Sequence, residues 1–384
     1  MSDRIPAEIF PPGEFLKAEL ISRGWSQVEL SEILGRPPRV VSEIVSAKRA
    51  ITPETAKGLG AAFNTSPDLW MNLESSYQLS KTRCETSRVK RRARLYSKFP
   101  VKEMIRRGWI KENKDIDRFE GAFCQYFAIS SIDATPTFQH AAKKTLYSEL
   151  PQIAQLAWLI RAENIAKTVR VAPFSTDSLV QAMNELKTCL NFVDDAKRVP
   201  AILARAGVRF VVVEFLPGAK LDGACFWIEE GASPVVALSL RLDRLDNFWH
   251  TLLHELDHIL HGEGKDEPIL DMLDSEFDEN GMPVQEVRAN RVASDFCVDR
   301  NILDHWIVRT GRKLTRAEIV RFASSLKLHP ALVIGQLQHR GVIPYSYHRD
   351  LLEKVRSVII ESAVTDGFGT TARAAHGPAR RSSA

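Results

Sequence analysis

The stretch NFWHTLLHELDHILHG, residues 247–262, holds four of the ten histidines in this 384-residue chain, grouped around one glutamate. A helix advances by about 100° per residue, so the leucines and isoleucine of this stretch fall on one side and its histidines on the other. This segregation predicts a helix that has one face in a core and ends at Gly262. The histidine face is either a metal site or a solvated polar face.

His254 and His258 lie one helical turn apart, so both imidazoles can bind one cation at about 2.0–2.1 Å. Glu255 lies beside His254 but further round the helix, where it can hold a water instead of the cation. Together they form H-E-x-x-H, the pattern in which the glutamate is a general base. We therefore expect the two histidines as metal ligands and Glu255 as the catalytic residue.

A hydrolytic zinc site needs a third protein ligand and an open fourth position. The segment VQEVRANRVASDFCV, residues 284–298, has helical spacing and places Glu286 in its first turn. Glu286 is therefore a candidate ligand, and Asn290, one turn further on, is a candidate for orienting a ligand histidine. The alternative is that Glu286 only interacts favourably with the helix dipole.

The residues before the histidine helix predict a small sheet. GVRFVVVEFLPG, residues 207–218, is rich in β-branched and aromatic residues and predicts a buried strand. Two more apolar segments follow at 221–231 and 233–241, with turn signals between them. We expect a short meander of strands, with a packing helix over residues 193–207 ahead of it.

With these segments in place, the region from Leu190 to Tyr347 resembles the ImmA/IrrE family of metallo-endopeptidases. The resemblance rests on FWIEEG (226–231), the H-E-x-x-H helix, EVRAN (286–290) and ALVIGQLQHRGVIPY (331–345). It implies a small zincin-like domain in which Zn²⁺ is held by His254, His258 and Glu286, with Glu255 as the base. His250 departs from the family, which usually has an aromatic residue there. His261 is expected to interact with the helix end instead of a metal.

The first eighty residues show several short helices with marked starts. Ser26 and Glu29 form a capping box, and Thr52-Pro53 and Ser66-Pro67 each place a capping residue before a first-turn proline. Two of these helices meet at Gly35-Arg36-Pro37, which predicts a helix-turn-helix inside a five-helix bundle. A helical bundle that binds only protein is the alternative.

The second helix of such a pair enters the major groove of DNA. The residues that we expect to contact DNA are Gln27, Arg39, Val40, Ser42, Glu43, Lys48 and Arg49. Arg39 would read guanine edges, whereas Gln27, Lys48 and Arg49 are placed for phosphates.

The region from Pro11 to Tyr77 resembles the HigA antitoxin branch of the Xre-type repressors, through PPGEFLKAEL (11–20), WSQVELSEILG (25–35) and the segments after them. The resemblance implies operator binding, and such domains usually read two half-sites as a homodimer. Pro37 and Arg39 stand where small hydroxyl residues are common, and Ala47 stands where glycine is common. The operator sequence therefore does not follow from the resemblance.

The rest of the chain carries no chemical motif. Residues 81–111 are strongly basic, and Arg88 to Arg94 would either follow DNA phosphates or form a solvated linker. From Ile116 to Leu186 the pattern predicts a mostly helical connector, and from Asp366 onward a disordered tail. The predicted divisions are 1–80, 81–189, 190–350 and 351–384.

Composition limits the compartment and the class of protein. Cys84, Cys124, Cys189, Cys225 and Cys297 are widely spaced without C-x-x-C, which argues against a disulfide framework or a cysteine zinc site. The start has no apolar signal core, and no apolar run reaches membrane-spanning length. We expect a cytoplasmic protein without a membrane passage.

These observations predict an α+β chain that is mostly α. It would join a five-helix helix-turn-helix domain, a helical connector and a small zincin-like domain with a short β-sheet. The expected function is a DNA-binding transcriptional regulator of a toxin–antitoxin, stress or mobile-element operon. Its zinc endopeptidase would cut a repressor-like protein or its own basic connector, and Tyr345, Tyr347 and His348 are weak candidates for stabilising the intermediate. The alternative is an antitoxin and autorepressor that neutralises an mRNA nuclease toxin, with the zinc domain as a sensor or scaffold.

Overall fold

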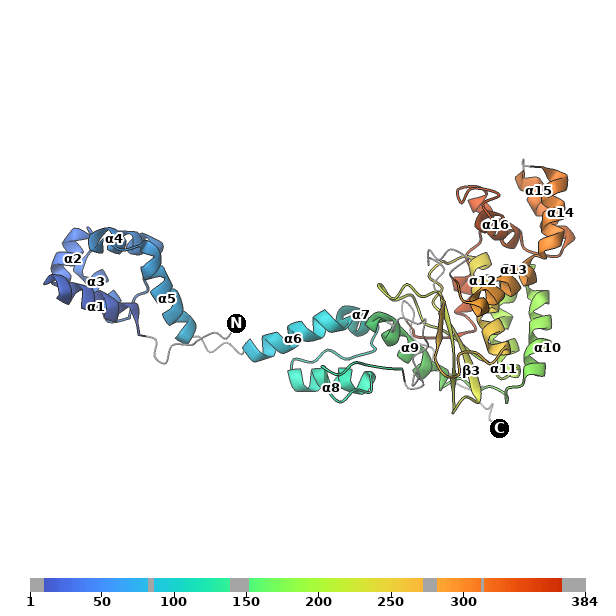
Figure 1. Ribbon diagram of the computed structural model, residues 1–384, viewed down its shortest axis with the longest axis horizontal. Coiled ribbons are helices and arrows are strands. Elements are labelled where there is room, and N and C mark those ends of the chain that lie inside the picture. Colours follow the sequence, from blue (N-terminus) through green and yellow to red (C-terminus); the bar gives the residue numbers. More distant parts are fainter. Residues whose placement is uncertain (1–9, 82–85, 139–151, 272–281, 312–313, 368–384) are drawn as a thin grey trace, which may run out of the picture. The chain divides into compact units, whose positions relative to one another are not determined.

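A computed structural model of the chain describes residues 10–81, 86–138, 152–271, 282–311 and 314–367 (Figure 1). The chain divides into two compact units, the first ending at Val89 and the second beginning at Lys90, and each is described by itself. The fold class is α+β and mostly α, as the sequence predicts. Within the described ranges, no helix is both long and apolar enough to cross a membrane.

The first unit is a bundle of five helices. They are α1 (Pro12–Arg23), α2 (Gln27–Ile33), α3 (Pro38–Val45), α4 (Pro53–Phe63) and α5 (Pro67–Lys81). The expected capping box opens α2: the Ser26 hydroxyl accepts from the Glu29 backbone N–H, and Glu29 accepts from the Ser26 N–H at 2.7 Å. Leu16, Leu30 and Leu59 are fully buried in its core.

The apolar face of α2 is narrower than the sequence suggests. Ile33 is apolar but 50% exposed, because Leu30 makes the core contact of this two-turn helix. Gly35 follows with a φ of 62°, the left-handed conformation that a tight turn into α3 needs. The helix-turn-helix arrangement of α2 and α3 therefore forms as predicted.

The second unit is built on a five-stranded sheet. Its strands are β1 (Arg209–Val212), β2 (Gly223–Ile228), β3 (Ser233–Leu238), β4 (Ile269–Asp271) and β5 (Val364–Thr365), in the order β4-β2-β3-β1-β5. β2 and β3 form an antiparallel pair, but β1 lies parallel to β3. The expected meander is therefore wrong. The four residues of β1 are all buried, as is usual for parallel strands covered on both faces.

Helices cover the sheet on both faces. The helices after residue 85 are α6 (Thr86–Lys98), α7 (Val101–Arg106), α8 (Ile116–Tyr126), α9 (Ile153–Ala166), α10 (Thr176–Leu186), η1 (Lys187–Cys189), η2 (Val193–Arg198), α11 (Val199–Arg205), α12 (Leu245–Leu260), α13 (Val284–Cys297), α14 (Arg300–Thr310), α15 (Arg316–Ser325), α16 (Pro330–His339), η4 (Arg349–Leu351) and α17 (Arg356–Ile359). Figure 1 shows α10, α11 and α12 beside the strands.

Alternate residues of each strand pack into different cores, as a pleated strand requires. Phe210 and Val212 of β1 join the core with α10 to α12, whereas Val211 joins the core with α6 to α9. The connector helices are therefore one layer of the second unit, and residue 190 is not a domain boundary. The sequence could not show this because the connector's own apolar positions do not reveal which surface they cover.

The segment after residue 350 also belongs to the second unit. Val364 pairs with Val211, so β5 extends the sheet beside β1, and Ile359 of α17 is fully buried. The predicted division at residue 351 is therefore too early. Most of the tail that the sequence predicts to be disordered, residues 368–384, lies outside the described residues.

Candidate metal centre

Helix α12 carries the H-E-x-x-H residues through the interior of the second unit. Every residue from Thr251 to Ile259 is buried, which includes His254 at 1% and His258 at 0% exposure. Leucines on one side of the helix pack into the core, and α13 and β2 pack against it as well. A solvated polar face, the alternative left open by the sequence, is therefore wrong.

Helix α13 brings Glu286 to the two histidines. The Nε2 atoms of His254 and His258 lie 3.0 Å apart, and the Glu286 carboxylate lies 3.1 Å from the first and 3.5 Å from the second. The three candidate ligand atoms lie within 4.8 Å of one another. The structure thus brings together the three residues that the sequence suggested as ligands.

These distances suit a small tetrahedral cation. Ligand atoms at about 2.0–2.1 Å from such a cation lie about 3.3 Å from each other, and the three observed separations fall on either side of that value. Two imidazoles and one carboxylate are also a donor set of hydrolytic zinc sites. Burial raises the pKa of Glu286, but hydrogen bonds with the histidines lower it to about 2, so the carboxylate is charged. The residues present therefore fit zinc.

Glu255 lies in a closed space beside Cys225, whose thiol pKa is raised by burial and by the Glu255 carboxylate. It is 0% exposed, and within the described part of the chain neither carboxylate oxygen has a hydrogen-bond partner. Burial raises its pKa to about 8, and a cation at the neighbouring ligands would lower that pKa. A buried carboxylate beside a candidate metal site is suited to accept a proton from a water.

Gly223 leaves the room that Glu255 occupies. A Cβ at this first residue of β2 would lie 2.7 Å from Oε1 of Glu255 and 2.6 Å from Cγ2 of Thr251. Any larger residue would have to displace the candidate base. This position does not stand out in the sequence, because a glycine at the start of a strand looks like an ordinary turn signal.

Two further residues that the sequence analysis missed fix the orientation of His258. Oε2 of Glu263 lies 2.6 Å from Nδ1 of His258, and Arg288 donates to the same oxygen at 2.7 Å. Arg288 also donates to Asp257 at 2.7 Å, so it ties α13 to α12. Burial raises the pKa of Glu263, but hydrogen bonds from Arg288 and His258 bring it below its usual range. The sequence signal that could have identified Glu263 is its position, five residues after His258.

Asp271, the last residue of β4, is another buried acid near the site. Its side chain is buried, and burial raises its pKa to about 6, with the charge of His254 acting in the opposite direction. The register of the sheet places it opposite Gly223. It was not singled out in the sequence, where it reads as the end of a polar loop.

The remaining candidates lie less directly on the site. The amide of Asn290 donates to Sδ of Met282 at 3.5 Å, so its role toward a ligand histidine stays a prediction. The ring centroid of His250 lies 6.3 Å from that of His254, and burial lowers the pKa of His250 to about 3. His261 donates to the backbone carbonyl of Asp257 at 2.8 Å, which matches the expected helix-end role.

The three residues suggested for stabilising an intermediate have other contacts. Tyr345 and Tyr347 are 63% and 55% exposed, and their backbone carbonyls accept from Gln338. Nε2 of His348 lies 3.1 Å from the carbonyl oxygen of Leu314. None of these contacts includes a candidate metal ligand.

The residues expected to contact DNA surround α3 in the first unit. Gln27, Arg39, Ser42, Lys48 and Arg49 are exposed, while Val40 and Glu43 are half-buried. Glu43 accepts from Nε of Arg39 at 2.7 Å and from Nε of Arg49 at 2.9 Å. Glu43 thus fixes the orientation of the Arg39 and Arg49 side chains. Both hydrogen bonds use Nε and leave the terminal guanidinium nitrogens out.

Within the described residues, the basic segment is helical and partly packed against the second unit. It forms α6, where Arg91 binds Glu120 and Asp117, Arg92 donates to the carbonyl of Asn113, and Arg94 pairs with Asp133. These arginines bind α6 to α8 and the residues beside it, because carboxylates and backbone carbonyls there accept hydrogen bonds from the guanidinium groups. Their predicted role along DNA phosphates is therefore not supported by their contacts.

Comparisons with known proteins match both regions. Residues 16–70 match the family described as "Helix-turn-helix", and residues 205–327 match the family described as "IrrE N-terminal-like domain". The second match includes His254, Glu255, His258 and Glu286.

Individual relatives match the first region. Virulence-associated protein A of Dichelobacter nodosus is 40% identical over 72 residues, which is 18% of this chain and 71% of that protein. The uncharacterized HTH-type transcriptional regulator YddM of Escherichia coli is 29% identical over 82 residues, 21% of this chain and 87% of that protein. Among solved structures, Pseudomonas aeruginosa antitoxin HigA with the higBA promoter is 33% identical, covering 22% of this chain and 89% of that one, with a TM-score of 0.20.

Proposed function

We propose that this chain, which belongs to the helix-turn-helix family over residues 16–70 and carries an IrrE N-terminal-like domain over residues 205–327, is a DNA-binding regulator with a zinc-dependent endopeptidase. One observation carries the peptidase: two buried imidazoles and a carboxylate converge within 4.8 Å beside a buried glutamate. The operator-binding proposal stands on the exposed residues of α2 and α3 and does not depend on that site.

The residues of the candidate centre would have different roles in peptide hydrolysis. A zinc ion bound by His254, His258 and Glu286 would polarise the scissile carbonyl and acidify the attacking water. Glu255 accepts a proton from that water and returns it to the leaving amine. Glu263 orients His258, and burial of the whole group excludes bulk water from Glu255.

The peptidase is tested with purified, zinc-loaded full-length protein and a quenched fluorescent peptide library. We expect the wild type to cleave library peptides and Glu255→Gln to be slower by at least about 100-fold, because it loses the proton acceptor. Glu230→Gln, an exposed carboxylate on the turn after β2, is the matched control and retains activity. Equal cleavage by wild type and Glu255→Gln, at equal zinc content, would show that Glu255 is not the base.

Operator binding is tested with DNA from upstream of the coding sequence. Arg39→Ala should weaken binding by about 10- to 100-fold if its guanidinium reads a base. Lys48→Ala should weaken binding to all sequences and reduce the salt slope by about 1. Lys57→Ala, an exposed lysine on α4, serves as the control. Equal affinities for all four proteins would remove α3 and its flanks from the interface.

The proposed substrate is a repressor-like protein, and cleavage of this chain by itself is the less favoured alternative. The arginines of α6 bind the α8 region, so cleavage within Arg91–Lys98 would first require that helix to unfold. Self-cleavage elsewhere is tested by incubating full-length wild type and Glu255→Gln with operator DNA. If both lose the first unit at the same rate, the chain does not cut itself.

Neutralisation of a toxin and homodimer formation stay predictions. A small basic protein encoded beside this gene that co-purifies with the chain would support the toxin partner. Binding of two chains per operator, measured by light scattering, would support the homodimer.

A further inference from the structure

His254 has a second ring nitrogen that the candidate metal centre does not use. Its Nε2 lies against Glu286 and His258, so a histidine that binds zinc through Nε2 keeps its proton on Nδ1. A ligand histidine usually donates this proton to a carboxylate or a carbonyl, which fixes the ring. Glu263 accepts it from His258, but Nδ1 of His254 is buried without a hydrogen-bond partner among the described residues.

Asp271, the last residue of β4, carries a buried acceptor. Its Oδ2 has no hydrogen-bond partner in the described part of the chain, although buried polar atoms of side chains usually have one. A charged carboxylate can only accept hydrogen bonds, whereas the protonated Nδ1 of a histidine can only donate one. Asp271 and His254 therefore complement each other chemically.

The sheet directs the Asp271 side chain toward α12. Asp271 lies opposite Gly223 in the antiparallel pair of β4 with β2, and residues opposite each other place their side chains on the same face. On that face, a Cβ at Gly223 would lie 2.6 Å from Cγ2 of Thr251 and 2.7 Å from Oε1 of Glu255. Ile269, two residues before Asp271, packs against the same core as α12. Asp271 therefore faces the turn of α12 that carries the first ligand histidine.

The charges of the two groups act on each other. Burial lowers the pKa of His254, but a hydrogen bond with Glu286 and the nearby charges, that of Asp271 first, raise it to about 9. Burial raises the pKa of Asp271 to about 6, and the charge of His254 is the strongest influence in the opposite direction. Mutual effects of this kind require the two groups to lie close together.

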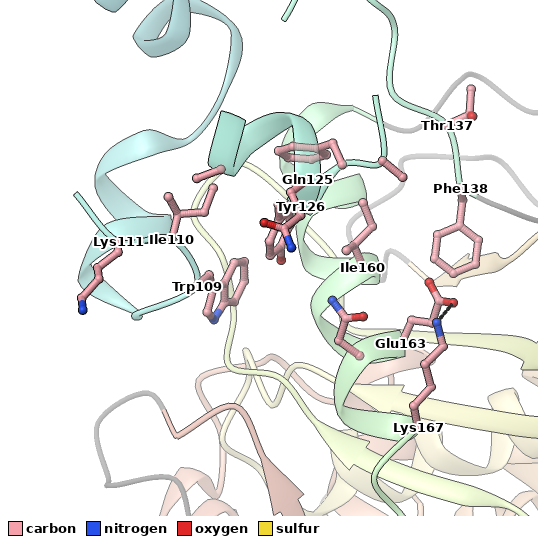
Figure 2. A pocket seen from close by; sticks show the side chains of 14 residues that line it. Trp109, Ile110, Lys111, Gln125, Tyr126, Thr137, Phe138, Ile160, Glu163 and Lys167 are labelled. Atoms are coloured by element: carbon pink, nitrogen blue, oxygen red, sulfur yellow. Dashed lines mark ion pairs between the residues drawn. The ribbon is translucent and has the colours of Figure 1, made fainter. Parts of the chain in front are cut away.

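Other partners for Nδ1 of His254 are less suited. A polar cavity can supply a water, and the connector layer contains a cavity of about 510 Å³, but neither His254 nor Asp271 lines it (Figure 2). The Thr251 hydroxyl is also buried without a partner among the described residues, but a neutral hydroxyl is a weaker acceptor than a carboxylate. The surroundings of His254 therefore favour Asp271.

We propose that Asp271 is the positioning residue of His254: its Oδ2 accepts the hydrogen bond from Nδ1 when Nε2 binds zinc. The inference rests on the metal centre of the proposed function. Two carboxylates then fix the two ligand histidines, Asp271 from the edge strand of the sheet and Glu263 from the residues after α12. Asp271 acts through His254 and contacts neither the metal nor the substrate.

Zinc affinity of the full-length protein, measured by competition with a chelating dye, tests this role. Asp271→Asn keeps the shape of the side chain but loses its charge, so zinc affinity should fall by about 10- to 100-fold. Asp266→Asn makes the same change at an exposed position before β4 and should bind zinc as the wild type does. Thr251→Val should also keep wild-type affinity. A larger loss in Thr251→Val than in Asp271→Asn would assign the hydrogen bond to the hydroxyl and overturn the inference.

Nuclear magnetic resonance separates the hydrogen bond from a merely structural effect. In protein with isotopically labelled histidine and saturating zinc, the Nδ1 proton of His254 should move upfield in Asp271→Asn, because a neutral acceptor forms a weaker hydrogen bond. The Nδ1 proton of His258 should stay in place, and Glu263→Gln, which moves it, assigns that resonance.

Two outcomes overturn the inference while the metal centre stands. One is equal zinc affinity in wild type and Asp271→Asn. The other is a loss of affinity without movement of the His254 proton, which would show that Asp271 acts by some route other than this hydrogen bond. If the wild type binds no zinc, the proposed metal centre itself is wrong, and the inference fails with it.

Discussion

At the scale of single residues, the candidate metal centre includes groups that would not contact the metal. Glu263 lies against the far nitrogen of His258, and Arg288 holds Glu263 and Asp257 together. Such partners set the tautomer and direction of a ligand histidine. Since Arg288 is two residues from Glu286 on α13, the same contact also fixes the helix that supplies the carboxylate.

Glu263→Gln tests this supporting role. The variant keeps the shape of the side chain but loses the charge that accepts from His258, so zinc affinity should fall by about 10- to 100-fold. Competition with a chelating dye measures the affinity, and Glu230→Gln is the exposed control. Identical zinc affinity in wild type and Glu263→Gln would mean that the contact is incidental to metal binding.

Ala47 offers a test of backbone strain in the first unit. Its φ is 55°, a left-handed conformation that costs a residue with a Cβ about 1–2 kcal/mol. Ala47→Gly should therefore raise the free energy of unfolding by about 0.5–1 kcal/mol after the entropy cost of glycine. Urea denaturation provides the measurement.

The control for this substitution is Ala61→Gly, at an exposed position inside α4, which should lower stability by about the same amount. If both glycines destabilise equally, the strain at Ala47 is not real.

At the scale of elements, helix starts were easier to predict from the sequence than the pairing of strands. The capping residues Ser26 and Thr52 begin α2 and α4 where the sequence places them, because a cap is a contact within one turn. The leucine spacing similarly located α12. Strand order was not predictable, since β1 is fully buried and pairs with β3, a choice that depends on which helices cover it. The sequence left two interpretations of Glu286 open: a metal ligand, or a glutamate that only interacts with the helix dipole.

The first unit should lose stability as the pH falls through the acid range. Hydrogen bonds from the Ser26 backbone and side chain lower the pKa of Glu29, and Arg39 and Arg49 lower that of Glu43. A lowered pKa means that the unfolded chain binds protons first. The stabilisation is therefore present above about pH 4.3 and is lost as the pH falls through the folded pKa.

Urea midpoints of residues 1–81 between about pH 6 and pH 3 measure this loss. The double variant Glu29→Gln, Glu43→Gln should be less stable at pH 6 and show a weaker pH dependence. A pH dependence as steep as that of the wild type would place the responsible carboxylates elsewhere.

At the scale of the whole molecule, the connector helices are part of the second unit. Its helices bury one face of the sheet, including Val211, Phe226 and Val235, all at most 1% exposed. Arg107 of the connector donates to the carbonyls of Glu214 and Phe215, just after β1. The sequence predicted a separate helical connector, because its apolar positions do not reveal that they cover the sheet.

A truncation tests this division. A fragment of residues 190–384 should lack a cooperative thermal transition by circular dichroism, while residues 90–384 should unfold cooperatively. Exposing the sheet face that α6 to α9 cover would cost on the order of 10 kcal/mol, comparable with the whole stability of a typical domain. A stable, cooperative 190–384 fragment would contradict the two-layer account.

The most direct test of the metal centre is the zinc content of dialysed full-length protein by mass spectrometry. Wild type should hold about one zinc per chain, as expected for one closed set of three protein ligands. His254→Ala and Glu286→Gln should each hold much less, with circular dichroism spectra like that of wild type. Equal zinc in wild type and Glu286→Gln, or none in any of the three, would contradict a site formed by these residues.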